Sequence, residues 1–175
     1  MSTPTSATAT LLPLSGIGYD VHAFIAGRPL ILGGVEIPSE RGLDGHSDAD
    51  VLSHAIADAI LGAVGEVDIG QHFPNTDPAY RGISSLELLR RVMTLVHEKG
   101  GRLLNIDASL IAEAPKVGPY VLTMRQRLGA ALGLSPARVG VKATTNERMG
   151  FVGRGEGIAA LAVASVLVPD QAAIQ

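Results

Sequence analysis

The chain has 175 residues, no cysteine, and 14 basic against 17 acidic residues, for a formal net charge of −3. This length predicts one domain with a full core, and the charge gives no electrostatic footprint for nucleic acid. Without cysteine, disulfides and thiolate metal sites are excluded, so a bound metal must be held by His and carboxylate groups. No apolar run is long enough for a membrane span without charge or glycine breaks, so membrane association is not expected.

The two ends of the chain differ from its middle. Residues 1–13 are rich in Ser, Thr and Ala, carry no charged side chain, and lack the basic start and long apolar core of a signal peptide. We therefore expect a disordered tail over 1–13, a single domain over 14–169, a short tail over 170–175, and a cytoplasmic protein.

The first predicted element is a strand over residues 14–24. Asp20 and His22 are two residues apart, so they project from the same face of this strand. Taken alone, a hydrogen-bonded surface pair is the simpler explanation for them, although they also suit half of a metal site. Residues 29–38 then predict a hairpin with its turn at Gly33–Gly34.

The most informative element is a helix predicted to begin at Ser47 and to end near residues 62–65. Ser47 suits the N-cap, and Asp50 completes an S-x-x-D capping pattern. One face of this helix is apolar. The opposite stripe combines Ser47 and Asp50 with His54 and Asp58 and holds no Lys or Arg, which indicates a place where a cation binds.

The remainder of the chain alternates between helices and strands by its periodicity and its Gly and Pro positions. We expect, in order, a long loop over 66–82 that is either a connection or a functional lid, a helix over 84–101 with a capping box at Ser84–Glu87, a strand over 102–113, a helix over 115–133 with Pro119 near its first turn, a strand over 138–147, a Gly-rich turn over 150–157 and a buried strand over 158–170. These elements favour an α+β fold, with helices packed on one face of a single mixed sheet.

Three groups of residues suggest chemistry. Two imidazoles and one carboxylate form a common catalytic zinc shell, and Asp20, His22 and His54 are the most economical set if the helix packs across the end of the strand. In residues 142–147 (KATTNE), adjacent hydroxyls and a carboxylate suit phosphate oxygens and a hard cation, although a capped turn explains them equally well. The Gly-rich segment 150–157, with Arg154, is a weak phosphate motif.

Taken together, these pieces closely resemble the family of 2-C-methyl-D-erythritol 2,4-cyclodiphosphate synthases of the non-mevalonate isoprenoid pathway. The resemblance covers the chain from about Gly16 to Val168. It is carried by the segments GYDVHAF (18–24), ILGGVEIP (31–38), GHSDADVLSHAIADAILGA (45–63), DIGQHFPNTDP (68–78), APK (114–116) and KATTNERMGFVGRGEG (142–157). It implies a catalytic domain that forms a homotrimer, with the sheets facing the three-fold axis, the helices outside, and active sites between subunits.

The resemblance also implies roles for individual residues. Asp20, His22 and His54 hold Zn²⁺ or a similar divalent ion, and Glu147 binds Mg²⁺ or Mn²⁺ together with substrate phosphates. His46 and Thr145 stabilise charge that grows in the transition state. The expected substrate contacts are Asp20, Val21, His22, His46, Ser47, Asp68, Ile69, Gly70, Phe73, Pro74, Asn75, Thr76, Asp77, Ala112, Ala114, Pro115, Lys116, Val117, Gly118, Ala143, Thr144, Thr145, Asn146, Glu147, Phe151 and Arg154. Phe151 and Arg154 match residues beside an axial cavity that holds isoprenoid diphosphates in the family.

The implied substrate is 4-diphosphocytidyl-2-C-methyl-D-erythritol 2-phosphate. Its 2-phosphate oxygen attacks the β-phosphorus, CMP leaves, and the product is a cyclic diphosphate. Asn75 stands where many relatives carry Asp, and Val117–Gly118 is smaller than the bulky pair that often lines the cytosine pocket. Two other functions stay open: a zinc phosphodiesterase or nucleotide hydrolase that uses water, and a non-catalytic trimer that binds metal or isoprenoid diphosphate.

Overall fold

The computed structural model of the chain describes residues 10–170, and most of the two predicted tails, residues 1–9 and 171–175, lies outside the described residues. The elements are, in order, β1 (Leu11–Ala26), β2 (Leu30–Leu32), β3 (Val35–Ile37), β4 (Arg41–Leu43), α1 (Val51–Ala63), α2 (Ile69–His72), a 3₁₀ turn (Pro78–Tyr80), α3 (Ser85–Glu98), β5 (Arg102–Ile111), a 3₁₀ turn (Gly118–Tyr120), α4 (Val121–Leu132), a 3₁₀ turn (Pro136–Arg138), β6 (Val139–Thr144), α5 (Gly150–Gly153) and β7 (Gly157–Pro169).

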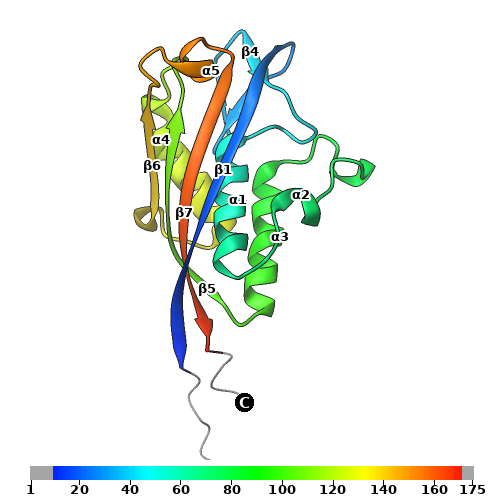
Figure 1. Cartoon of the computed structure of the whole chain (residues 1–175), viewed down its shortest axis with the longest axis vertical. Helices are drawn as coiled ribbons and strands as arrows, with labels where there is room; N and C mark the ends of the chain where they lie inside the picture. The colour runs from blue at the N-terminus through cyan, green and yellow to red at the C-terminus, as the bar shows by residue number, and fades with distance from the viewer. Residues whose placement is uncertain (1–9, 171–175) are drawn as a thin grey trace, which may run out of the picture.

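The main sheet has five strands in the order β4-β1-β7-β5-β6 (Figure 1). β5 and β6 are parallel and the other pairs are antiparallel, so the mixed sheet and the α+β class predicted from the sequence are confirmed. The prediction of a single sheet is wrong in one respect, because β2 and β3 form a separate two-stranded hairpin around Gly33–Gly34. β1 pairs with β7 from Leu11 onwards, so residues 11–13, expected in the tail, belong to the sheet.

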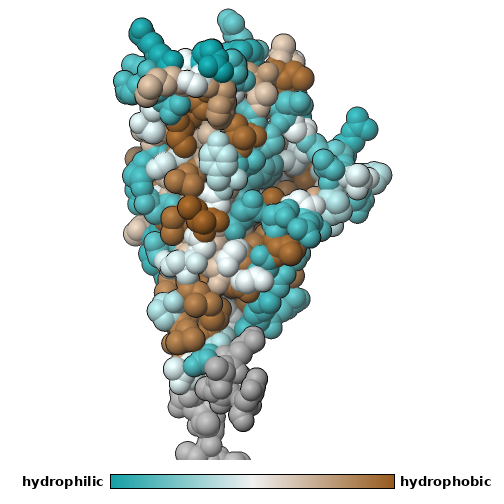
Figure 2. All heavy atoms as spheres, viewed as in Figure 1, coloured by the Kyte–Doolittle hydropathy of each residue, from teal (hydrophilic) through white to brown (hydrophobic). Residues whose placement is uncertain are grey.

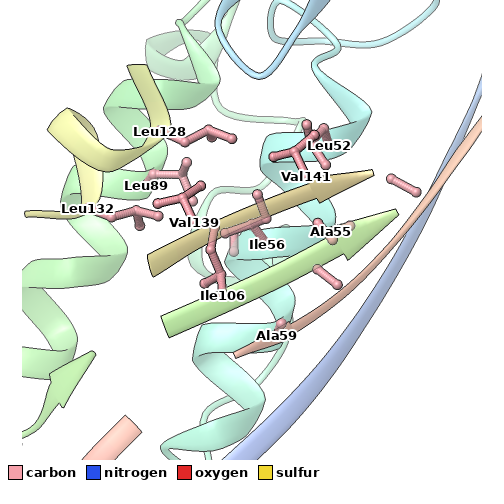
Figure 3. Packing of buried hydrophobic residues seen from close by; sticks show 14 of the residues in the cluster. Leu52, Ala55, Ile56, Ala59, Leu89, Ile106, Leu128, Leu132, Val139 and Val141 are labelled. Atoms are coloured by element: carbon pink, nitrogen blue, oxygen red, sulfur yellow. The ribbon is translucent and has the colours of Figure 1, made fainter. Parts of the chain in front are cut away.

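One apolar core lies between the main sheet and the helices (Figure 3). Leu52 and Ile56 of α1 reach it from the helix side, and Ile106 and Val139 reach it from β5 and β6. α3 and α4 close the same core with side chains such as Leu89 and with Leu128 and Leu132. This packing fixes α1 against β1 and β7 and therefore fixes every side chain that α1 presents at its N-terminal end.

Two glycines of β1 let α1 lie directly on the strand. A Cβ added at Gly18 would lie 2.0 Å from the carbonyl oxygen of Ala55, and one added at Gly16 would lie 2.1 Å from that of Ala59. No real side chain fits at such distances, so here the separation of strand and helix is set by backbone contact. The next outward positions on this face of β1 are Asp20 and His22, which consequently lie close to the start of α1.

The other face of the sheet exposes large apolar side chains on its central strands. Ile17, Tyr19 and Val21 of β1 are exposed, and Leu161 and Val163 of β7 lie opposite Tyr19 and Ile17. Figure 2 shows hydrophobic patches along this part of the surface. An exposed apolar patch rimmed by polar groups commonly marks a surface for another molecule.

The start of α1 differs from the prediction. The helix begins at Val51, and its N-cap is Asp50, whose carboxylate accepts from the Ser53 amide at 3.1 Å. Ser47 lies in the preceding turn, where its hydroxyl accepts from the Ala49 amide at 3.1 Å. The capping pattern was misassigned because Ser and Asp both favour N-caps, and the choice between them is made by tertiary contacts.

Two other boundaries and one capping contact also differ from the prediction. The helix predicted over 115–133 begins only at Val121, because residues 118–120 form a separate 3₁₀ turn that contains Pro119. Ser84 is the N-cap of α3, but its side chain makes no capping hydrogen bond. Residues 150–153 of the predicted Gly-rich turn form the one-turn helix α5. Within residues 10–170, no helix is long and apolar enough to cross a membrane.

Candidate active site

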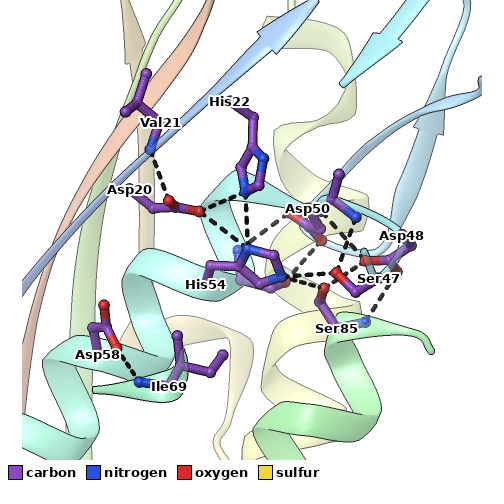
Figure 4. A network of polar contacts seen from close by, with 12 residues as sticks. Asp20, Val21, His22, Ser47, Asp48, Asp50, His54, Asp58, Ile69 and Ser85 are labelled. Carbon is purple, nitrogen blue, oxygen red and sulfur yellow. Dashed lines mark hydrogen bonds and ion pairs between the residues drawn. The ribbon is translucent and has the colours of Figure 1, made fainter. Parts of the chain in front are cut away.

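The side chains of Asp20, His22 and His54 converge on one point (Figure 4). Asp20 Oδ2 lies 3.0 Å from His22 Nε2 and 3.0 Å from His54 Nδ1, and the two ring nitrogens are 3.1 Å apart. β1 supplies the first two residues and the first turn of α1 supplies the third. The predicted strand pair and helix residue are therefore brought together by the packing of α1 on β1.

The three atoms Asp20 Oδ2, His22 Nε2 and His54 Nδ1 form a triangle, which has the composition and size of a metal centre. A tetrahedral zinc ion with ligands at about 2.0–2.1 Å has its ligand atoms roughly 3.3–3.4 Å apart, close to the separations of 3.0 to 3.1 Å among these three atoms. Two imidazole nitrogens and one carboxylate oxygen are also ligands that zinc accepts, with a fourth position left for a water or substrate oxygen. These residues therefore fit a divalent ion.

Neighbouring groups orient the His22 ring and shift the pKa values of Asp20 and His22. His22 Nδ1 donates to the carbonyl oxygen of Asp44, which leaves Nε2 free to face the other two atoms. Burial alone raises the pKa of Asp20, but the hydrogen bonds from His22 and His54 outweigh it and hold that pKa well below its ordinary value. Burial lowers the pKa of His22, whereas the neighbouring Asp20 carboxylate raises it, and the net shift is upward.

Two further carboxylates of the predicted acidic stripe accept hydrogen bonds from backbone amides and are not part of the triangle. Asp50 is fully buried and accepts from the amides of Gly33 and Gly34 at 2.8 and 2.7 Å, which joins the β2–β3 hairpin to the start of α1. Asp58 accepts from the Ile69 amide at 2.8 Å, and burial raises the pKa of its carboxyl. Of the four residues of this stripe, only His54 belongs to the triangle.

Sequence reasoning missed two residues behind the triangle. Ser85, the first residue of α3, has its Oγ 2.9 Å from His54 Nε2, and it donates its hydroxyl hydrogen to Asp48 (Figure 4). Asp48 follows the predicted His46–Ser47 pair in the sequence, but Ser85 is 37 residues further on. Only the docking of α3 against α1 brings these groups together, so no local pattern could have identified the pair.

A cavity of about 390 Å³ opens beside the triangle. Its walls contain nine of the predicted site residues, namely Asp20, His22, His46, Ser47, His54, Ile69, Gly70, Phe73 and Asn75. Gly45, Tyr80, Ile83 and Leu88, which were not predicted, complete the lining. The cavity is thus polar at the triangle and apolar on the side of α2 and α3.

The loop predicted over residues 66–82 covers one side of this cavity. It contains α2 and the 3₁₀ turn at Pro78–Tyr80, each capped by a preceding aspartate: Asp68 accepts from the Gln71 amide and Asp77 from the Ala79 amide. The Phe73 and Tyr80 rings contact each other edge to face at 5.5 Å between centroids. One-turn helices are too short to give a periodic pattern, which explains why the sequence predicted only a loop.

The predicted site residues of segments 112–118 and 143–147 form a second group at the far edge of the sheet, whereas Val21 is in β1 and Asp68, Pro74, Thr76 and Asp77 belong to the loop over 66–82. Ala112 donates its amide to Thr144 at 3.0 Å, and Thr145 Oγ1 donates to Glu147 Oε1 at 2.9 Å. Glu147 and Arg148 have left-handed φ values of 50° and 61°. Pairing runs from Val21 to Ala159, Ile111 and Thr144 across four strands, so this group lies at the same level as the triangle, about three strand spacings or roughly 14 Å away.

The predicted residues Lys116, Val117, Phe151 and Arg154 differ in how accessible their side chains are. Lys116 is exposed, whereas Val117 is buried in the core, so at that position only the backbone is available to a ligand. Arg154 is exposed and its Nε donates to Glu156 Oε1 at 2.6 Å, beside the partly exposed Phe151. Within one chain, the structure therefore separates the predicted residues around the cavity from those of segments 112–118 and 143–147.

Fold and site together define a class, that of α+β enzymes with a group of side chains between a strand and a helix that could hold a divalent metal ion. The chain belongs to the YgbB family, whose family model matches residues 14–167. A curated relative named 2-C-methyl-D-erythritol 2,4-cyclodiphosphate synthase, from Symbiobacterium thermophilum, is 65% identical over 153 residues, which are 87% of this chain and 98% of the relative.

Solved structures agree with this assignment. The bifunctional IspDF from Campylobacter jejuni is similar with a TM-score of 0.87 and 42% identity, over 92% of this chain and 44% of that longer chain. The IspF–CDP complex from Plasmodium falciparum is similar with a TM-score of 0.77 and 31% identity, over 91% of this chain and 97% of that chain. The family expected from the sequence is confirmed.

Proposed function

We propose that this protein is a 2-C-methyl-D-erythritol 2,4-cyclodiphosphate synthase, a phosphorus–oxygen lyase of the non-mevalonate isoprenoid pathway. The observation that carries the proposal is the Asp20–His22–His54 triangle at the wall of the cavity, in a chain that belongs to the YgbB family. The reaction converts 4-diphosphocytidyl-2-C-methyl-D-erythritol 2-phosphate into the cyclic diphosphate. The oxygen of the 2-phosphate forms a bond to the β-phosphorus, and the bond from that phosphorus to the CMP oxygen breaks.

In this reaction the protein positions phosphates and balances their charge, because phosphoryl transfer needs little covalent work from side chains. The divalent ions proposed here, zinc at the triangle and Mg²⁺ or Mn²⁺ at Glu147, supply charge neutralisation to the diphosphate oxygens. His46 lines the cavity next to Ser47, and both side chains offer hydrogen-bond donors to the erythritol phosphate part of the substrate. Burial of the cavity wall strengthens each of these contacts.

The cytidine part of the substrate is assigned to the second group of residues, from residues 112–118 and 143–147. Because this group lies at the same sheet level as the triangle but roughly 14 Å away, one chain cannot close both groups around the reacting phosphates. We therefore propose a homotrimer in which a neighbouring chain supplies its second group to the triangle. The exposed apolar face of β1 and β7 supports burial of the sheets around the three-fold axis.

Thr145 and Glu147 belong to a loop whose backbone is hydrogen-bonded to the side chain of Glu113. Glu113 Oε1 accepts from the amides of Asn146 and Arg148, both at 3.0 Å, on either side of the left-handed Glu147. Replacement Glu113→Ala removes this acceptor, so we expect faster amide exchange at both residues and a fall in kcat of about 10- to 100-fold, since small misplacements of catalytic groups are costly.

Glu113→Gln is the matched control, because its amide oxygen can still accept both bonds. Steady-state kinetics and hydrogen exchange of the two variants check the prediction. If Glu113→Ala exchanges and turns over like the natural protein, Glu113 does not hold this loop.

Two further expectations concern a second ligand site and the cellular location of the protein. Phe151 and Arg154 are proposed to lie near the three-fold axis, where an isoprenoid diphosphate binds, although Arg154 is paired with Glu156 within this chain. A cytoplasmic location stays a prediction from the sequence.

One experiment separates the proposed function from its alternatives. The protein is incubated with the cytidyl substrate, with and without a chelator, and CMP is measured together with the phosphorus NMR spectrum of the product. CMP with a cyclic diphosphate, abolished by the chelator, is the expected result. CMP with a linear product would instead indicate a hydrolase that uses water. No CMP at all would leave only a binding protein.

A further inference from the structure

His54 must present a bare nitrogen to hold a metal ion. Its Nδ1 is the atom that faces the triangle, at 3.0 Å from Asp20 Oδ2 and 3.1 Å from His22 Nε2. In a neutral imidazole one nitrogen carries the hydrogen and the other has the lone pair. The hydrogen must therefore be on Nε2, which points away from the triangle toward α3 (Figure 4).

The acceptor for that hydrogen is set by Asp48. The Asp48 carboxylate accepts from both the backbone amide of Ser85, at 3.0 Å, and the Ser85 hydroxyl. Because the hydroxyl hydrogen is directed to the carboxylate, the lone pairs of Ser85 Oγ are available to His54 Nε2, 2.9 Å away. Ser85 is only 1% exposed, so water does not compete for this contact.

Ser47 also lies near His54 Nε2, at 3.1 Å, but it is placed differently. Its Oγ accepts from the Ala49 amide, and its side chain lines the cavity, where it can meet a ligand. Ser85 and Asp48 are absent from the cavity wall. They can therefore influence a bound metal only through His54.

We propose that Ser85 and Asp48 are positioning residues, which hold His54 in the tautomer with Nδ1 bare and fix the direction of its ring. This rests on the proposed function only in that Asp20, His22 and His54 are taken to bind the metal. Partners of this kind orient ligand imidazoles and typically contribute 10- to 100-fold to metal affinity or activity. Here the partner is on α3, so the docking of α3 on α1 becomes part of the metal centre.

The test compares Ser85→Ala with Ser84→Ala. Ser84 is the exposed neighbour and makes no capping hydrogen bond with its side chain, so its replacement controls for loss of a hydroxyl at the start of α3. Zinc affinity is measured by competition with a chromophoric chelator. We expect Ser85→Ala to bind zinc about 10- to 100-fold more weakly and Ser84→Ala to match the natural protein.

A second readout needs no metal. In the metal-free protein, the ¹⁵N NMR spectrum of the histidine rings reports which nitrogen of His54 carries hydrogen. Asp20 Oδ2, 3.0 Å from Nδ1, and Ser85 Oγ, 2.9 Å from Nε2, compete for this hydrogen, so we expect Ser85→Ala to shift the ring toward the Nδ1–H form relative to the natural protein. Unchanged zinc affinity together with an unchanged ring spectrum in Ser85→Ala would overturn the proposal.

Variants at Asp48 test the same idea without touching Ser85. Asp48→Asn keeps an oxygen that accepts from the Ser85 hydroxyl and should restore most of the zinc affinity that Asp48→Ala loses. The double variant Asp48→Ala, Ser85→Ala should be no weaker than either single variant, because the two residues act as one unit. Additive losses would contradict this. If the natural protein and His54→Ala bind zinc equally, the proposed metal site fails, whereas the ring spectra still decide the role of Ser85.

Discussion

The variant His54→Ala is expected to lose its bound zinc and its turnover while it remains folded. The triangle would keep only Asp20 and His22, too few ligands for a stable catalytic zinc centre. A metal that polarises a phosphoryl oxygen contributes several kcal/mol to the transition state, so we expect kcat to fall by about 10³-fold or more. Zinc content by elemental analysis, kcat with the cytidyl substrate, and the circular dichroism spectrum measure the three outcomes.

His97→Ala is the control for this prediction. His97 lies in the last turn of α3 and is exposed, away from the cavity, so its loss should change neither zinc content nor kcat. A His54→Ala protein that keeps the zinc content of the natural protein would show that His54 is not a ligand.

The variant Ile17→Asp is expected to break the proposed trimer and abolish turnover, while each chain keeps the proposed zinc site. Ile17 is on the exposed apolar face, opposite Val163 of β7, and a carboxylate buried there without a partner costs several kcal/mol per chain. On our proposal, turnover requires residues 112–118 and 143–147 of a neighbouring chain. A monomer should therefore be inactive even at saturating substrate. Analytical ultracentrifugation and kinetics on the same samples test this.

Leu122→Asp provides a matched control on α4. Leu122 is 69% exposed and Ile17 is 68% exposed, so the two changes place the same charge at equally accessible positions of a single chain. Only Ile17 is on the sheet face, and Leu122→Asp should stay trimeric and active. A trimeric, active Ile17→Asp protein would exclude this face as the subunit interface.

The sequence was sufficient to predict those features that depend on the spacing of residues close together in the chain. The Asp-x-His pair at residues 20–22, the hairpin turn at Gly33–Gly34 and the strand β7 are all found as predicted, although β7 is buried on one face only. His54 was selected because an acidic, His-bearing stripe without basic residues is unusual on a helix. The structure brings its side chain to those of Asp20 and His22, and its role as a metal ligand stays a prediction.

The sequence was insufficient where distant segments decide the outcome. Ser47, Asp48 and Asp50 are all good capping residues, and only the docked hairpin and α3 determine that Asp50 caps α1 and that Asp48 binds Ser85. The separation between the triangle and the Thr145–Glu147 loop likewise depends on strand order, which hydrophobic periodicity does not encode.

The contact of Gly16 and Gly18 with the backbone of α1 has a consequence for the choice of cation. Because strand and helix already touch, the triangle cannot become smaller, and the shared core on the other side of α1 opposes its widening. Ions with ligand bonds near 2.0–2.2 Å suit this opening, whereas Ca²⁺, which takes six to eight oxygen ligands at about 2.3–2.6 Å, does not. On the proposed function, these two glycines help to set the distance between the ligands on β1 and the ligand on α1, and so favour small divalent ions over Ca²⁺.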